Sequence, residues 1–172
     1  MQLKTERLVL RQFAETDFAA LREIAADPEV LRYRRADVIS EERTRDFLRH
    51  AQTAPLADPR MAFPFAIVLA ESNRLIGECG LTRLEAEQDE AFLWYSLNRH
   101  YWGQGYATEA ARALVRFGLI EVGLHRISAG CHAENIASQR VLEKIGFRLA
   151  GRVPVTDGLR FNLQRNEFDE AK

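Results

Sequence analysis

Two glycines, one residue apart, precede the clearest amphipathic helix that the sequence predicts. Residues 102–110 read WGQGYATEA, and helical periodicity then extends over residues 108–122. The N–H groups of a first helical turn have no partner within the helix, and the helix dipole adds positive potential there. Because Gly103 and Gly105 have no side chain to keep a phosphate away from the backbone, this segment predicts a site for an anion such as a pyrophosphate.

The same glycines have a purely structural interpretation, a tight turn that needs positive φ. Two common nucleotide sites are excluded, because the sequence has no GxxxxGK[ST] segment and Glu109 stands near the place of the third glycine of GxGxxG. An anion at this helix start also requires that the Glu109 carboxylate points away from it.

The segment from Trp102 to Ala107 resembles the coenzyme-binding loop of the GNAT acetyltransferases, which has the form [Q/R]xxGx[G/A]. Gly105 and Ala107 occupy its small positions, and Trp102 replaces the leading Gln or Arg. The longer sequence YWGQGYATEA is similar to the branch that contains the Rim-type acetyltransferases of ribosomal-protein N-termini. An aromatic residue is common at the leading position in that branch.

Other segments resemble the same branch, in the same order, over nearly the whole chain. Residues 135–147 are similar to its second coenzyme motif, NxxSxxxLEKxGF. The further matching segments are residues 5–11, 27–30, 75–77 and 80–81. Two coenzyme motifs in one chain are more specific than either alone, so the resemblance implies an N-acetyltransferase that uses acetyl-CoA.

The resemblance also implies where the coenzyme lies. The main chain of the glycine loop would bind the pyrophosphate, and the preceding strand would pair with the pantetheine amides as if the coenzyme were an added strand. A backbone N–H near Leu97 would polarise the thioester carbonyl. The implied coenzyme residues are Tyr95, Ser96, Leu97, Gly103, Gln104, Gly105, Tyr106, Ala107, Thr108, Asn135 and Ser138.

Asn135 and Ser138 each have two interpretations. By resemblance Asn135 contacts the pantetheine region, and it is equally a helix N-cap. A serine at the place of Ser138 protonates or orients the leaving thiolate in similar proteins, or it is simply an exposed serine of the first helical turn. Many GNAT enzymes have a catalytic tyrosine where this chain has Leu142. Since thiols have a pKa of about 8.5, coenzyme A thiolate leaves readily near neutral pH without a dedicated acid.

The general base does not follow from the resemblance. An amine is mostly protonated at pH 7 and must lose a proton before it attacks. The two places where family members carry a glutamate hold Phe92 and Gly130 in this chain. Glu90 is the first candidate base, because it points to the same strand face as Phe92, and Glu78 is the second. The alternative interpretation of each is a solvated carboxylate at a strand end, without a catalytic role.

We expect the acceptor site among the first helices, residues 31–35 and the last hairpin. Residues 31–35 read LRYRR, which suits an acidic acceptor but is also typical of a solvated loop. The last hairpin is shorter, between Val155 and Leu159, than in similar proteins. The acceptor therefore stays open between a protein or peptide N-terminus and a small-molecule amine.

The elements that position these motifs follow from hydrophobic periodicity. The predicted order is β-α-α-β-β-β-α-β-α-β-β in one domain, residues 1–172, of the α/β class, with a mixed sheet and helices on both faces. The resemblance implies the GNAT fold, a mostly antiparallel sheet of about seven strands that is splayed between the fourth and the fifth. The predicted strands are residues 3–13, 63–70, 75–84, 91–97, 126–131, 147–155 and 159–168. The predicted helices begin after caps at Thr16 and Ser40, at Thr108 and at Ala137.

Composition and charge exclude several classes of function. The chain has 24 basic and 25 acidic side chains, so no nucleic-acid partner is expected. No apolar run approaches the roughly 20 residues that cross a bilayer, and the first residues lack the apolar core of a signal peptide, so we expect a cytoplasmic protein without a membrane partner. Cys79 and Cys131 lack metal-binding spacing, and no metal is expected.

These observations predict transfer of an acetyl group from acetyl-CoA to a primary amine, by direct attack in a ternary complex. The vacant base positions leave open an alternative, an acetyl-CoA-binding sensor or interaction module of the same fold with weak catalysis. A Rossmann domain is disfavoured, because three successive strands over residues 63–97 interrupt the alternation that it needs. The sequence is compatible with a monomer or a homodimer.

Overall fold

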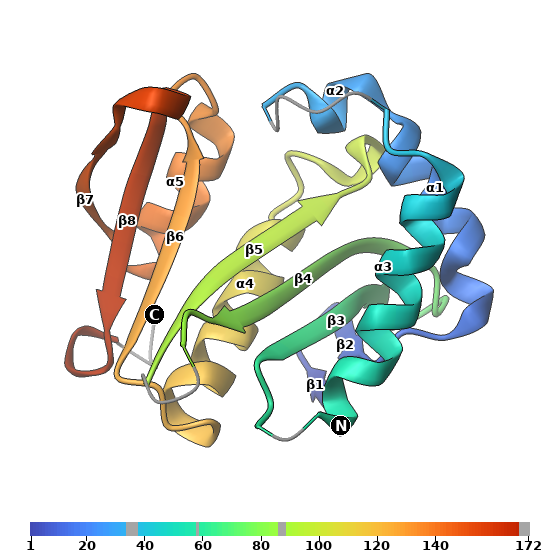
Figure 1. Ribbon diagram of the computed structural model, residues 1–172, viewed down its shortest axis with the longest axis horizontal. Coiled ribbons are helices and arrows are strands. Elements are labelled where there is room, and N and C mark those ends of the chain that lie inside the picture. Colours follow the sequence, from blue (N-terminus) through green and yellow to red (C-terminus); the bar gives the residue numbers. More distant parts are fainter. Residues whose placement is uncertain (34–37, 58, 86–88, 169–172) are drawn as a thin grey trace.

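One eight-stranded mixed sheet runs through the protein, with helices on both of its faces (Figure 1). The computed structural model describes residues 1–33, 38–57, 59–85 and 89–168. The strand order is β1-β2-β3-β4-β5-β6-β8-β7, and all neighbours are antiparallel except the parallel pair β5 and β6. The strands are β1 (Gln2–Lys4), β2 (Leu8–Arg11), β3 (Ala62–Leu69), β4 (Leu75–Arg83), β5 (Glu90–Leu97), β6 (Arg126–His132), β7 (Arg148–Val153) and β8 (Gly158–Gln164). The predicted α/β class with a mixed, mostly antiparallel sheet is confirmed.

The sheet has eight strands, not the expected seven, because the first predicted strand is divided in two. Strands β1 and β2 pair with each other in an antiparallel hairpin. The Leu8 N–H donates to the Thr5 hydroxyl at 3.0 Å, and the Thr5 N–H donates to the Leu8 carbonyl at 3.0 Å. This short-range pairing turns the chain where period-two alternation alone suggested a continuous strand.

Helices α1 (Phe18–Ala26) and α3 (Glu41–Thr53) pack together on one face of the sheet, with α2 (Pro28–Leu31) beside α1. Helices α4 (Tyr106–Arg116) and α5 (Ile136–Ile145) pack together on the other face, as Figure 1 shows. The 3-10 turns are Glu15–Asp17, Ala54–Leu56, Arg99–Tyr101, Pro154–Thr156 and Arg165–Glu167. Both faces of the sheet are therefore covered, as predicted.

The expected Thr16 cap is wrong. A 3-10 turn precedes α1, and the Asp17 carboxylate accepts the Ala14 N–H at 2.8 Å, so Asp17 closes this turn. Arg11 also pairs with Asp17 at 2.7 Å, which ties the start of α1 to the end of β2. The Ser40 cap is confirmed, since its hydroxyl accepts the Arg43 N–H at 3.2 Å.

Helix α4 begins two residues earlier than predicted and changes its winding at its end. Residues Phe117–Glu121 form a π-helical turn, in which the Val122 N–H donates to the Phe117 carbonyl at 3.0 Å. The turn lies against the sheet at Gly118, where a Cβ would meet a Leu81 methyl at 2.5 Å. Glycine at this position lets the turn approach the sheet more closely than any other residue would.

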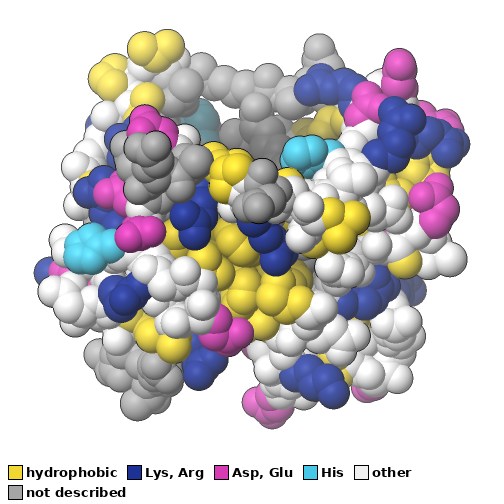
Figure 2. All heavy atoms as spheres, turned by 60° about the horizontal axis from the view of Figure 1, so that its bottom comes forward, with side chains coloured by type: hydrophobic (Ala, Val, Ile, Leu, Met, Phe, Trp, Pro, Cys, Tyr) yellow, Lys and Arg dark blue, Asp and Glu magenta, His cyan; other side chains and the backbone are white. Residues whose placement is uncertain are grey.

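The hydrophobic core has one part on each side of the sheet. The larger part lies under α4 and α5 and includes Leu93, Leu114 and Ile127, and the smaller part lies under α1 and α3 and includes Ile24 and Leu48. Hydrophobic side chains also reach the surface. Figure 2 shows a group of them in the middle of one face, with most charged side chains nearer its edges.

Strands β5 and β6 separate before they end. Their pairing runs from Glu90↔Arg126 to Leu93↔Ala129, while β5 continues to Leu97 and β6 to His132. Figure 1 shows the two strands diverging beyond this point. The expected splay is confirmed, and the unpaired end of β5 leaves an edge of main-chain groups inside the sheet.

Candidate functional site

A cavity of about 1170 Å³ lies at the splay. That volume exceeds the roughly 300–1,000 Å³ of a pocket for one small ligand, so it has room for a coenzyme arm and a second substrate. Elements from both halves of the chain contribute to it, including α1 and α3 on one side and α4 and α5 on the other. The coenzyme residues predicted from the sequence that line it are Tyr95, Ser96, Leu97, Gly103, Gly105, Tyr106, Ala107, Thr108, Asn135 and Ser138.

The glycine loop has the backbone conformation that its sequence predicted. Gly103 has φ of 74° and Gly105, the N-cap of α4, has φ of 85°. A Cβ at Gly103 would meet no atom within 4 Å, so the backbone conformation, not lack of space, favours glycine there. No side chain caps the start of α4. The tight turn and the anion site are therefore compatible, since Gly103, Gly105 and the first residues of α4 all line the cavity.

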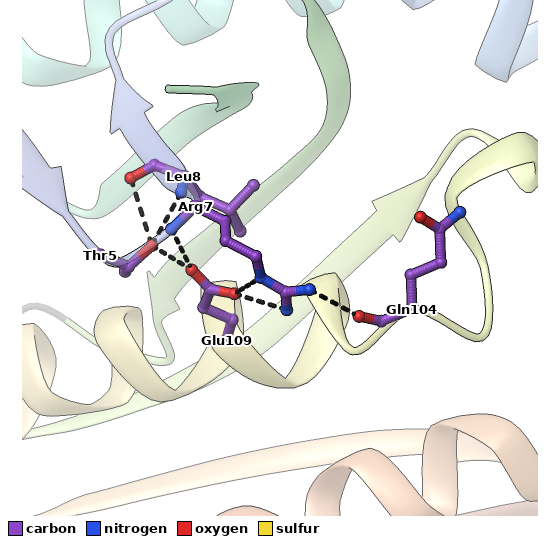
Figure 3. Close-up of polar contacts among 5 residues, drawn as sticks. All are labelled: Thr5, Arg7, Leu8, Gln104 and Glu109. Carbon is purple, nitrogen blue, oxygen red and sulfur yellow. Dashed lines mark hydrogen bonds and ion pairs between the residues drawn. The ribbon is translucent and has the colours of Figure 1, made fainter. Parts of the chain in front are cut away.

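The Glu109 carboxylate points away from the cavity, toward the β1–β2 hairpin (Figure 3). One of its oxygens accepts the Thr5 hydroxyl at 2.6 Å and the Arg7 N–H at 2.9 Å, and the other accepts the Arg7 guanidinium at 2.7 Å. Partial burial alone would raise the pKa of Glu109, but the hydrogen bonds from Thr5 and Arg7 outweigh it and lower that pKa. The acidic residue in the first turn of α4 is thus neutralised outside the cavity.

Arg7 also contacts the glycine loop, from a position outside the cavity. Its guanidinium donates to the Gln104 carbonyl at 3.0 Å (Figure 3). It also stacks over the Tyr106 ring, 4.4 Å from the ring centroid. Gln104 itself does not line the cavity, and its side chain donates to the His100 carbonyl at 3.1 Å. This role of Arg7 was not predicted from the sequence. The feature that could have indicated it is the segment 5–11, which resembles the family branch and contains Arg7.

Asn135, Ser138 and Tyr95 form one hydrogen-bonded group at the start of α5. The Asn135 side chain accepts the Ser138 N–H at 3.0 Å, which confirms the N-cap interpretation. The hydroxyls of Tyr95 and Ser138 lie 2.6 Å apart. Burial raises the pKa of Tyr95 to about 12, although its hydrogen bond with Ser138 opposes the rise. Tyr95 is therefore a protonated hydroxyl at neutral pH, next to the serine that resemblance placed at the coenzyme sulfur.

Cys131 is a half-buried thiol beside the same group. Burial raises its pKa, and a hydrogen bond with Ser138 partly opposes that rise. Trp102, at the leading position of the loop, donates its indole N–H to the Leu97 carbonyl at 2.9 Å. This contact closes the glycine loop back onto the end of β5.

The two candidate bases lie in different places. Glu90 is at the beginning of β5, pairs with Arg126 at 2.6 Å and does not line the cavity. It lies five positions before Tyr95 on the strand, about 16 Å away at roughly 3.3 Å per residue. Glu78 lines the cavity and is the register partner of Ser96. The geometry therefore favours the second candidate, Glu78, over the first.

Of the expected acceptor elements, the first helices and Tyr33 line the cavity. Arg32 is exposed and lies 3.9 Å from Glu29, whereas Arg34 and Arg35 are outside the described residues. The last hairpin borders an adjoining hollow of about 380 Å³, which Phe92 and Gly130 also line. The described walls near α1 and α3 are mainly apolar.

Two further properties of the described residues concern metal-ligand groups and membrane-spanning helices. Within the described residues, no three His, Cys, Asp or Glu side chains are grouped as a metal site would require. In the same part of the chain, every helix is too short or too polar to cross a membrane.

Known proteins resemble this chain in sequence and in fold. Residues 7–148 match the family described as acetyltransferase (GNAT) domain. The chain is 35% identical over 151 residues to YnaD of Bacillus subtilis (strain 168), named an uncharacterized N-acetyltransferase, and the match covers 88% of this chain and 85% of YnaD.

Solved structures agree with these matches. An acetyltransferase (GNAT family) from Bacillus anthracis is 31% identical, with a TM-score of 0.83 over 97% of this chain and 100% of that one. RimL, a ribosomal alpha-N-protein acetyltransferase in complex with coenzyme A, shares the fold at 20% identity, with a TM-score of 0.81 over 95% of this chain and 98% of RimL. The resemblance to the GNAT acetyltransferases is confirmed, and RimL shares the fold of this chain.

Proposed function

The chain belongs to the GNAT family of acetyltransferases, and we propose that it transfers the acetyl group of acetyl-CoA to a primary amine in the cytoplasm. The observation that carries this proposal is that both coenzyme motifs line one cavity, at the point where β6 diverges from β5. The two substrates would occupy this cavity together, so the acetyl group passes directly from sulfur to nitrogen.

The coenzyme would lie along main-chain groups. Residues 103–108 would bind the pyrophosphate through the N–H groups at the start of α4. The pantetheine amides would pair with residues 95–97, where β6 has diverged from β5. Asn135 would stay the N-cap of α5 while its exposed edge borders the pantetheine arm. The coenzyme A in the RimL structure supports this choice of co-substrate.

The reaction needs one proton to leave the amine and one to reach the sulfur. The neutral amine nitrogen would attack the thioester carbon, and the C–S bond would break as the carbonyl re-forms. Ser138 would donate its hydroxyl proton to the departing thiolate and take the proton of Tyr95, which has a pKa of about 12 and is protonated before the reaction. Tyr95 would then regain a proton from water in the cavity, which balances the proton that leaves the amine. Glu78 would accept the amine proton, directly or through water. The products are an N-acetyl amide and coenzyme A.

A second candidate function is a sensor that binds acetyl-CoA and has weak catalysis. Its basis is that Phe92, Gly130 and Leu142, which cannot ionise, stand at three positions where similar proteins carry catalytic groups. Both functions require the coenzyme to bind. They differ in turnover alone.

The experiment combines calorimetric titration of acetyl-CoA with a thiol-release assay over a broad panel of amines and N-terminal peptides. The proposal expects binding and free thiol that appears only when an amine is present. Binding without amine-dependent thiol release over the whole panel would support the sensor. Absence of coenzyme binding would overturn both functions.

A further inference from the structure

An aromatic wall, Phe13, Phe47 and Trp94, stands beside the end of β5. Phe47 of α3 packs edge-on against Trp94 with ring centroids 6.1 Å apart, and against Phe13 with centroids 5.5 Å apart. The Trp94 indole N–H donates to the Thr82 hydroxyl at 3.2 Å. Phe47 and Trp94 both line the cavity. These contacts hold the two rings in one orientation before any ligand arrives.

The wall lies on the opposite face of β5 from the Tyr95 side chain. Tyr95 is directed to Ser138 of α5, while the neighbouring Trp94 is directed to Phe47 of α3. Ser96 follows on the same face as Trp94, because side chains alternate along a strand. Its register partner Glu78 therefore also stands on the wall's side of the sheet. We expect an amine to approach the thioester from this side, where Phe47, Trp94 and Glu78 all line the cavity.

Among the described residues, few other side chains that line this side are polar. Leu21, Ile24, Val30 and Ile39 line it with apolar side chains. The hydroxyl of Thr44, another lining residue, is already engaged, since it donates to the Ser40 carbonyl at 3.0 Å and accepts from Arg22 at 3.0 Å. The other charged residues that line this side, in the part of the chain that the structure describes, are the exposed Glu29 and Arg43.

We propose that the acceptor is a primary amine joined to an aromatic ring through a short apolar linker. This inference rests on the proposed acetyl transfer and names its substrate class. The ring packs against Phe47 and Trp94, and the ammonium group lies near Glu78 before it loses its proton. A diamine would place its second charge against the apolar wall, and an acidic amino acid would bring a carboxylate toward Glu78.

The test compares acetylation of 2-phenylethylamine, 1,4-diaminobutane and glutamate. We expect kcat/KM for 2-phenylethylamine to exceed both others by about tenfold or more, the usual effect of burying one aromatic ring. Phe47→Ala should raise KM for 2-phenylethylamine by about tenfold and leave KM for acetyl-CoA unchanged. His50→Ala is the matched control, because His50 is exposed on the same helix and does not line the cavity.

Binding measurements separate this inference from the proposed function. Saturation-transfer NMR with 2-phenylethylamine and free coenzyme A needs no turnover, and it should show contact that Phe47→Ala abolishes. If Phe47→Ala fails to fold, Phe47→Leu keeps most of the volume and removes the ring, and it should still raise KM. Acetylation of other amines with no binding of 2-phenylethylamine overturns the inference alone. Phe47-dependent binding without any acetylation overturns acetyl transfer and leaves the ligand class standing.

Discussion

The two sides of the cavity differ in whether main-chain groups or side chains would recognise a ligand. On the side that we propose for the coenzyme, recognition would depend mainly on the main chain, through residues 103–108 and the edge of β5 from which β6 diverges. On the side that we propose for the acceptor, it would depend on the side chains of Phe47, Trp94 and Glu78. Main-chain recognition constrains few residue types beyond glycine, whereas side-chain recognition changes with each substitution. One fold can therefore retain its coenzyme while its acceptor varies.

The largest effect should come from the acceptor side. Glu78→Gln should lower kcat/KM for the amine by about 100-fold at pH 7, because removal of a general base typically costs that much. Glu90→Gln should change it less than twofold, since Glu90 pairs with Arg126 outside the cavity. Steady-state kinetics of both variants decides between the two carboxylates. The reverse pattern would return Glu90 to the role of base.

The next effect tests the coenzyme side. Gly105→Ala should weaken acetyl-CoA binding by about 10- to 100-fold, the value of one hydrogen bond to a charged group, because its φ of 85° is strained for alanine. Gly123→Ala is the control, since Gly123 has the same φ of 85° and does not line the cavity. It should lower the melting temperature and leave the calorimetric Kd unchanged. Equal loss of coenzyme binding in both would mean that stability alone was measured.

A smaller effect is expected where the two sides meet. Tyr95→Phe removes the hydroxyl that lies 2.6 Å from that of Ser138, and it should lower kcat by about tenfold with little change in KM for acetyl-CoA. The effect stays below the usual range for general acids, since the thiolate leaves readily. Ser138→Ala in the Tyr95→Phe background should add little if the two hydroxyls act as a unit. Additive losses would contradict the proposed relay.

The smallest effect concerns the support behind the loop. Glu109→Gln should lower the free energy of unfolding by less than about 1 kcal/mol, as expected for a partly exposed ion pair. Because the folded pKa of Glu109 lies below its unfolded value of about 4.3, its contribution is present above pH ~4.3 and is lost as the pH falls through the folded pKa. Urea unfolding of both proteins between pH 7 and pH 3 should show their curves converge at low pH. A gap that persists at pH 3 would assign the effect to something other than this charge.

Local sequence predicted most of the coenzyme side. The glycines before α4, the Asn135 cap and the helices themselves depend on residues within about one helical turn of each other. The same rule explains two failures. The predicted first strand is continuous because alternation hides a turn closed by Thr5, and the predicted Thr16 cap is wrong because Asp17, paired with Arg11, closes the turn before α1.

The sequence by itself therefore determined the family, the glycine loop and the order of the elements, apart from the division of the first strand into β1 and β2 and the short helix α2. Only the tertiary structure joined Arg7 to Glu109, set Tyr95 against Ser138, and placed Glu78 rather than Glu90 beside the cavity. The partners Arg7 and Glu109 are 102 residues apart, and Tyr95 and Ser138 are 43 apart. Contacts over such separations depend on how the sheet and helices pack, which no local pattern specifies, and the acceptor side consists almost entirely of contacts of this kind.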